Sequence, residues 1–196
     1  MKKLAYIAVP LLMVSCGGTE EVENQVEEII EEVEIVEETG DGEKERKSPR
    51  VTVEAEINDL TVAIDYGSPR VKGREIWGEL VPYDKIWRAG ADEATAITFG
   101  SDVLFGGSAV AAGTYALFVV PHAEGNWEVI LNEEWSKEEH GVWGAYDYNA
   151  EKDVVKIEVT PTWNQETVEE MSFKIMNSEL IFEWELASFK VSIEKA

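Results

Sequence analysis

The sequence predicts an all-β protein: a single antiparallel β-sandwich, jelly-roll-like, over residues 49–196, preceded by an acidic tether over residues 16–48. Three observations predict this. After residue 50, apolar side chains recur at every second position in a series of short segments, which is typical of strands that bury one face. Turn-forming residues such as Asn58-Asp59 and Gly106-Gly107 lie between segments of this kind. No long amphipathic helix is predicted after residue 50.

The alternating segments extend over most of the predicted domain. Their apolar members are, in chain order, Val51, Val53, Ala55 and Ile57; Leu60, Val62, Ile64 and Tyr66; Trp127, Val129 and Leu131; Val155, Ile157 and Val159; Met171, Phe173 and Ile175; Leu180, Phe182 and Trp184; Phe189, Val191 and Ile193. The segment 115–120 differs because it is apolar on both faces, which predicts a central strand covered on both sides.

The first fifteen residues have the anatomy of a secretory signal that ends at a cysteine. A basic start is followed by an apolar run from Leu4 to Met13, and small residues then flank Cys16. The apolar run is shorter than the roughly 20 residues that a membrane-spanning helix needs. The pattern resembles a bacterial lipoprotein signal, which implies removal of residues 1–15 and lipid attachment at Cys16. We therefore expect the mature protein to be held at a membrane through Cys16.

The tether is dominated by glutamate. Val22, Val26, Ile29, Val33 and Val36 recur at alternating spacings of four and three, a heptad seam that would suit a helix or a weak coiled coil. The flanking positions are nearly all glutamate and would repel one another across a parallel pair. A solvated spacer is therefore favoured over a pairing helix, and the sequence leaves the oligomeric state open.

Composition excludes several classes of function. The formal net charge is −23, and it becomes −25 when Lys2 and Lys3 leave with the signal. Such a charge repels nucleic acid, so nucleic acid is not an expected partner. Cys16 is the only cysteine. If it carries lipid, the folded domain has no disulfide, no cysteine-ligated metal and no cysteine nucleophile.

One region of the chain resembles a known family. The segment 66–99 reads YGSPRVKGREIWGELVPYDKIWRAGADEATAITF, and it is followed by AGTYALFVVP at 112–121, a strand at 127–132 and WGAYDY at 143–148. This arrangement, over roughly residues 51–195, resembles the uncharacterised family called domain of unknown function 2911, which occurs largely in envelope and secreted proteins of Gram-negative bacteria. The family commonly has asparagine where this chain has Asp92. The resemblance implies a fold and a location in the cell envelope, and it implies no activity.

The same region holds an island of positive charge. All five arginines lie between residues 46 and 88, although more than half of the chain follows. Arginine offers a planar fork for carboxylate, phosphate or sulfate, and tryptophan offers a flat stacking face. The functional hypothesis is a pocket for a small anionic or sugar-like ligand. Its predicted residues are Arg70, Arg74, Trp77, Trp87, Arg88, Asp92 and Glu93. The competing hypothesis is structural: the arginines pair internally with carboxylates, and the tryptophans fill the end of the sandwich.

Other site chemistry finds little support in the sequence. The two histidines, His122 and His140, are not spaced as a zinc pair. The stretch 147–158 has the acidic spacing of a calcium loop, but Lys152 stands at its sixth position, where the sharp turn needs glycine. We expect neither a metal nor a cofactor.

We therefore expect a lipid-anchored protein of the Gram-negative envelope, at the outer membrane, that serves as a non-enzymatic binding or accessory module. One alternative is a carbohydrate-active hydrolase that uses paired carboxylates. Another is a purely structural envelope lipoprotein.

Overall fold

The computed structural model describes residues 34–36 and 46–196 of the chain. Eleven strands are present in this part: β1 (Glu34–Val36), β2 (Arg50–Ile57), β3 (Leu60–Gly67), β4 (Thr95–Phe99), β5 (Val103–Phe105), β6 (Ser108–Val110), β7 (Gly113–Val120), β8 (Trp127–Asn132), β9 (Asp153–Val159), β10 (Thr162–Met176) and β11 (Glu179–Lys195). The described helices are short: α1 (Lys137–His140) and two 3-10 turns, Gly144–Asp147 and Ala150–Lys152.

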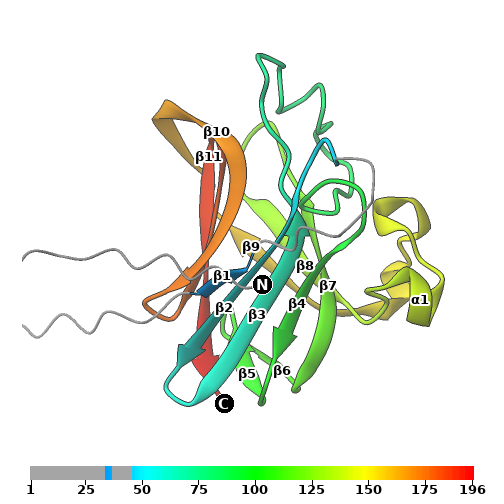
Figure 1. The fold of residues 1–196 in the computed structure, drawn as a ribbon, viewed down its shortest axis with the longest axis vertical. Coiled ribbons are helices and arrows are strands. Elements are labelled where there is room, and N and C mark those ends of the chain that lie inside the picture. The colour runs from blue at the N-terminus through cyan, green and yellow to red at the C-terminus, as the bar shows by residue number, and fades with distance from the viewer. Residues whose placement is uncertain (1–33, 37–45) are drawn as a thin grey trace, which may run out of the picture. The chain divides into compact units, whose positions relative to one another are not determined.

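The strands form two antiparallel sheets that pack face to face (Figure 1). The larger sheet has seven strands in the order β1-β2-β3-β4-β7-β8-β9. The smaller sheet has four strands in the order β10-β11-β5-β6. The predicted all-β, antiparallel sandwich is therefore confirmed.

The alternating apolar residues form the core between the sheets. Ile64 of β3 and Ile97 of β4 are fully buried from one side, and Phe182 of β11 is fully buried from the other. Burying a side chain of this size stabilises the fold by roughly 1.5–3 kcal/mol. The period of two in the sequence thus reports which face of each strand lies inside.

Aromatic rings fill one part of this core. The centroid of the Trp77 ring lies 4.6 Å from that of Trp127 and 5.9 Å from that of Trp184. The Trp87 ring stacks on Trp184 at 5.7 Å. Most of these contacts are edge-to-face or stacked, the geometries that aromatic quadrupoles favour.

The central position of β7 is also confirmed. Leu117 and Val119 point into the core between the sheets, whereas Ala116 and Phe118 join a second apolar cluster on the opposite face. Trp135, Ala145 and Tyr148, from the segment that carries α1, pack against this second cluster together with Ile86 and Val120. Figure 1 shows α1 beside β7 and β8, outside the larger sheet.

The two tight turns form as predicted. Asn58 and Asp59 have φ angles of 48° and 61°, and Ile57 pairs with Leu60 across them. Both angles lie in the left-handed region, which asparagine and aspartate tolerate better than most residues. Gly106 and Gly107 close the β5–β6 hairpin in a similar way.

Part of the predicted tether adopts a strand, since β1 pairs with β2 in antiparallel register. The signal segment 1–15, Cys16 and the rest of the tether up to residue 45 lie outside the described residues. No helix in the described part of the chain is long and apolar enough to cross a membrane.

Candidate functional site

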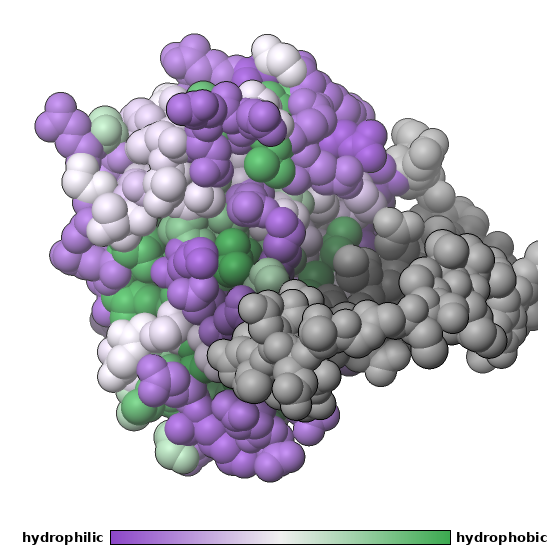
Figure 2. All heavy atoms as spheres, turned by 90° about the vertical axis from the view of Figure 1, so that its left-hand side faces the viewer, coloured by the Kyte–Doolittle hydropathy of each residue, from purple (hydrophilic) through white to green (hydrophobic). Residues whose placement is uncertain are grey.

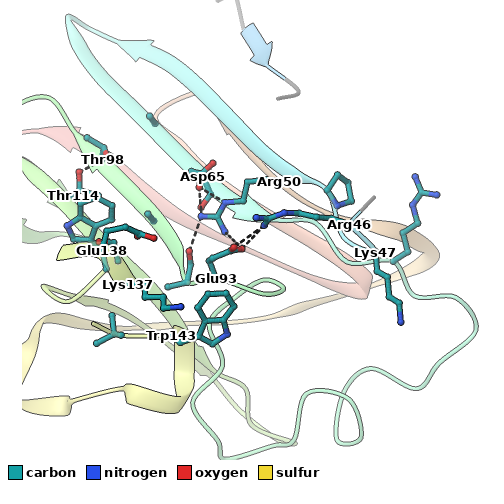
Figure 3. Close-up of a pocket in the computed structure, with 18 of the residues that line it drawn as sticks. Arg46, Lys47, Arg50, Asp65, Glu93, Thr98, Thr114, Lys137, Glu138 and Trp143 are labelled. Carbon is teal, nitrogen blue, oxygen red and sulfur yellow. Dashed lines mark hydrogen bonds and ion pairs between the residues drawn. The ribbon is translucent and has the colours of Figure 1, made fainter. Parts of the chain in front are cut away.

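A broad hollow of about 1150 Å³ lies on the outer face of the seven-stranded sheet. Its floor comes from β3, β4 and β7, one wall from the chain that leads into β2, and the opposite wall from the segment around α1 (Figure 3). The lining residues are Arg46, Lys47, Pro49, Arg50, Ala63, Asp65, Arg70, Lys72, Glu93, Ala94, Ala96, Thr98, Thr114, Trp135, Ser136, Lys137, Glu138, Val142 and Trp143.

The floor is open because its outward-facing side chains are small. Ala63, Thr98 and Thr114 are direct cross-strand neighbours on β3, β4 and β7. The hydroxyl oxygens of Thr98 and Thr114 lie 2.9 Å apart and share a hydrogen bond. Larger side chains at these positions would fill the hollow, so its depth follows directly from the sequence of three adjacent strands.

Arg50 forms hydrogen bonds to both Asp65 and Ala94 at the edge of the hollow. Its Nε donates to Asp65 Oδ1 at 2.5 Å, and its Nη2 donates to the carbonyl of Ala94 at 3.0 Å. Thr52 donates to the other oxygen of Asp65 at 2.8 Å. The remaining nitrogen, Nη1, is buried without a hydrogen bond and lies 3.8 Å from Glu93 Oε2. These contacts fix the guanidinium at the edge of the hollow, where its positive charge attracts an anion.

Glu93 links the two arginines of the rim. Arg46 Nη1 donates to both of its carboxylate oxygens, at 3.0 and 2.8 Å. Burial raises the pKa of Glu93, but the hydrogen bond from Arg46 and the charges of Arg46 and Arg50 outweigh it, so that the pKa lies below its usual value. Glu93 is therefore an ionised support for the arginines at neutral pH.

The opposite wall is held by local hydrogen bonds. Ser136 caps α1 by accepting from the backbone N–H of Glu139 at 3.0 Å, and Gly141 ends the helix with a φ of 73°. The backbone N–H of Trp143 donates to Asp147 Oδ2 at 2.8 Å. The Trp143 side chain is 37% exposed, and the Lys137 ammonium lies 5.0 Å from its ring centroid. This cation–π contact places a positive charge and an aromatic surface side by side.

Tyr148 fixes the far end of the same segment. Its hydroxyl donates to Asp153 Oδ2 at 2.6 Å, and its ring packs against Phe118 of β7. Burial and the neighbouring Asp153 carboxylate raise the pKa of Tyr148, so it remains a neutral donor. The wall therefore rests on the sheet through Tyr148 rather than through α1 alone.

The side chains that line the hollow have a net positive charge, opposite in sign to the net charge of the chain. Six lysines and arginines line the hollow against three carboxylates, although the chain as a whole has a net charge of −23. The cations are Arg46, Lys47, Arg50, Arg70, Lys72 and Lys137, and the carboxylates are Asp65, Glu93 and Glu138. Asp65 and Glu93 are bound to arginine, which leaves Glu138 as the carboxylate without a hydrogen bond or ion pair to described residues.

The structure brings two of the seven predicted site residues, Arg70 and Glu93, to the hollow. Arg70 is about half exposed and pairs with Glu170 on β10 at 3.2 Å. Arg74 is exposed and donates to the backbone carbonyls of Val71 and Arg70 instead of turning to the hollow.

The other predicted residues lie elsewhere. Trp77 and Trp87 belong to the aromatic core described above. Asp92 is exposed, with a φ of 62°, in the turn before Glu93. Arg88 lies under the ring of Tyr146, with 5.6 Å from its guanidinium carbon to the ring centroid, and has one buried nitrogen, Nη1, without a hydrogen bond.

Sequence reasoning missed the most informative residues of the hollow, Arg50, Lys137 and Trp143. Arg50 opens β2 and Trp143 follows α1, so more than 90 residues separate them along the chain. One signal could have indicated the floor: small residues at the outward positions of β3 and β4, where Ala63 and Ala96 alternate with buried isoleucines.

The described residues contain no group of three or more His, Cys, Asp or Glu side chains placed to hold a metal ion. A family model with the description "Protein of unknown function (DUF2911)" matches residues 48–193, which confirms the resemblance seen in the sequence. No curated protein and no solved structure matches the chain.

Proposed function

The chain belongs to the DUF2911 family, and because the description of that family assigns no activity, we propose a function from the geometry: the protein is a non-enzymatic module that binds an anionic ligand in the hollow. We further propose that lipidated Cys16 holds this module at the envelope of a Gram-negative bacterium.

The observation that carries the proposal is the local reversal of charge. Six of the 17 lysines and arginines of the chain line one hollow. In an acidic protein, the surrounding field repels anions, so a site that attracts them needs a local excess of cations within about a Debye length, roughly 8–10 Å. Arg46, Arg50 and Arg70 form ion pairs within the fold. Lys47, Lys72 and Lys137 also line the hollow, and exposed like charges repel one another, so their concentration favours a site for anions.

The state of the carboxylates supports binding over hydrolysis. The hydrogen bond from Arg46 and the charges of Arg46 and Arg50 hold the pKa of Glu93 below its usual value, so Glu93 is ionised at neutral pH. Both oxygens of Asp65 accept hydrogen bonds, one from Arg50 and one from Thr52. A glycosidase needs one carboxyl group that is protonated and free to act as an acid. In the described lining, Glu138 is then the remaining carboxylate, and a glycosidase needs two.

Anion binding can be tested with citrate as the probe, by isothermal titration calorimetry at low ionic strength. We expect Lys47→Glu and Lys137→Glu each to weaken citrate binding about tenfold, because each replaces an attractive charge by a repulsive one. Lys190→Glu is the matched control, since Lys190 lies on the four-stranded sheet and not in the lining of this hollow. Equal citrate affinities in all three variants would contradict the proposal.

The anchor has its own experiment. We expect Cys16→Ser to move the protein from the membrane to the soluble fraction of cells, because the thiol is the site of lipid attachment. Continued partitioning of this variant with membranes would show that Cys16 is not the anchor.

A further inference from the structure

We propose that the ligand of the hollow is an acidic oligosaccharide, bound through several carboxylates along its length and through stacking of a sugar ring at Trp143. This inference rests on the proposed function, because it names the chemical class of anion that the same hollow takes.

The size of the hollow argues for an extended ligand. Pockets for small molecules usually enclose about 300–1000 Å³. At about 1150 Å³, this hollow exceeds the range that a single small carboxylic acid would fill. Its floor is a sheet face rather than a deep slot, and such a surface lets a chain of units lie across several strands.

The cations are spread around the hollow rather than focused on one point. Lys47 precedes β2, Lys72 lies between β3 and β4, and Lys137 opens α1. Figure 3 shows Lys47 and Lys137 on opposite sides of the Arg50–Glu93 pair. The charges of both lysines attract one compact anion, but charges repeated along an oligomer can pair with each lysine separately.

The polar groups of the hollow favour hydroxyl-bearing ligands over polyphosphates. Glu138 can accept hydrogen bonds from the hydroxyls of an acidic sugar, and an inorganic polyphosphate ionised at neutral pH offers few such donors. Thr98 and Thr114 share one hydrogen bond, which leaves the pair able to bond to a hydroxyl above the floor.

The wall supplies a surface for a ring. Trp143 is 37% exposed, although its backbone is fixed by Asp147 and Lys137 lies against its ring. A partly exposed indole offers apolar surface on which a sugar ring can stack. The adjacent Lys137 ammonium can then pair with the carboxylate of the sugar unit whose ring stacks on Trp143.

Three probes of three units each separate the parts of this inference when their affinities are measured by calorimetry on the full protein. Trigalacturonate has rings and charges, maltotriose has rings without charges, and tripolyphosphate has charges without rings. We expect trigalacturonate to bind about tenfold more tightly than either of the others. Adenosine diphosphate serves as a fourth probe, with an aromatic base in place of the sugar chain.

Variants of Trp143 identify the ring contact. We expect Trp143→Ala to weaken trigalacturonate binding about tenfold and to change tripolyphosphate binding by less than about twofold. Trp143→Phe keeps a flat ring and is expected to restore most of the affinity. Tyr146→Ala is the matched control, because Tyr146 is 82% exposed in the same segment but does not line the hollow. Thermal melts of each variant establish that it is folded.

The outcomes distinguish the two proposals. If tripolyphosphate or adenosine diphosphate binds as tightly as trigalacturonate, or if Trp143→Ala has no effect, the saccharide inference is overturned while anion binding stands. If maltotriose binds as tightly as trigalacturonate, or if neither citrate nor any of the other anions binds, the proposed function fails as well.

Discussion

The two outer faces of the sandwich use charge in opposite ways. On the four-stranded sheet, lysines pair one to one with glutamates of the adjacent strand or of the same strand, as in Lys174–Glu183 and Lys190–Glu179. A hollow of about 300 Å³ lies there. Figure 2 shows this face, with hydrophilic side chains around a few apolar ones. On the seven-stranded sheet, the cations outnumber the carboxylates around a hollow almost four times larger.

The difference comes from where the charges originate. In these two pairs of the smaller sheet, both partners are strand residues, so the lysine charges are neutralised within the sheet. On the larger sheet the strands supply small floor residues, and most of the cations come from connecting segments. Binding residues often lie on loops that a rigid sheet positions, which is the arrangement seen here.

The largest expected effect comes from a substitution in the core that the two sheets share. Trp127 is fully buried between the sheets and contacts the rings of Trp77 and Phe189. Trp127→Ala would leave a large cavity and cost about 3–5 kcal/mol of unfolding free energy. Urea denaturation followed by far-ultraviolet circular dichroism measures this loss. A cost below about 1 kcal/mol would show that the aromatic core does not join the two sheets.

An intermediate effect is confined to the face with the hollow. Glu93 has a folded-state pKa below its usual value, so it stabilises the fold above its unfolded pKa and loses this contribution as the pH falls through the folded value. We expect Glu93→Gln to cost about 1 kcal/mol at neutral pH, a value reduced because the side chain is one-third exposed.

The pH dependence of stability distinguishes this role from simple packing. The wild-type protein and Glu93→Gln should approach each other in unfolding free energy as the pH is lowered through the folded-state pKa of Glu93, because protonation removes the charge that the substitution has already removed. A constant difference from pH 7 to pH 3 would show that the arginine contacts of Glu93 contribute nothing.

The sequence predicted the strands of both faces but not the hollow. Strands such as β3 were predictable because burial alternates with the sequence, from Leu60 through Val62 to Ile64. The turns at Asn58-Asp59 and Gly106-Gly107 were predictable for a similar reason: asparagine, aspartate and glycine adopt the left-handed backbone angles that these turns need.

The hollow depends instead on contacts between distant segments. Arg50 reaches Asp65 and the carbonyl of Ala94 only because β2, β3 and β4 are neighbours in the sheet. The five arginines are close together along the chain, but not all of them line the hollow. Arg74 donates to backbone carbonyls near it in the chain, and Arg88 packs against the ring of Tyr146. Clustering along the chain does not specify side-chain direction, and direction decides which cations meet a ligand.

The smallest expected effect tests the face without the hollow. Lys174 is about half exposed and pairs with Glu183 across the β10–β11 hairpin. We expect Lys174→Ala to lower the unfolding free energy by about 0.5 kcal/mol, a value typical of exposed ion pairs. This loss should become smaller in high salt, because salt screens the pair. A double-mutant cycle with Glu183→Ala isolates the pairing energy from other effects of each substitution.

Citrate affinity should be unchanged in Lys174→Ala, because the pair neutralises itself and lies outside the lining of the hollow. A clear loss of citrate binding in this variant would mean that the net charge of the whole protein, rather than the arrangement of cations on one face, governs anion binding.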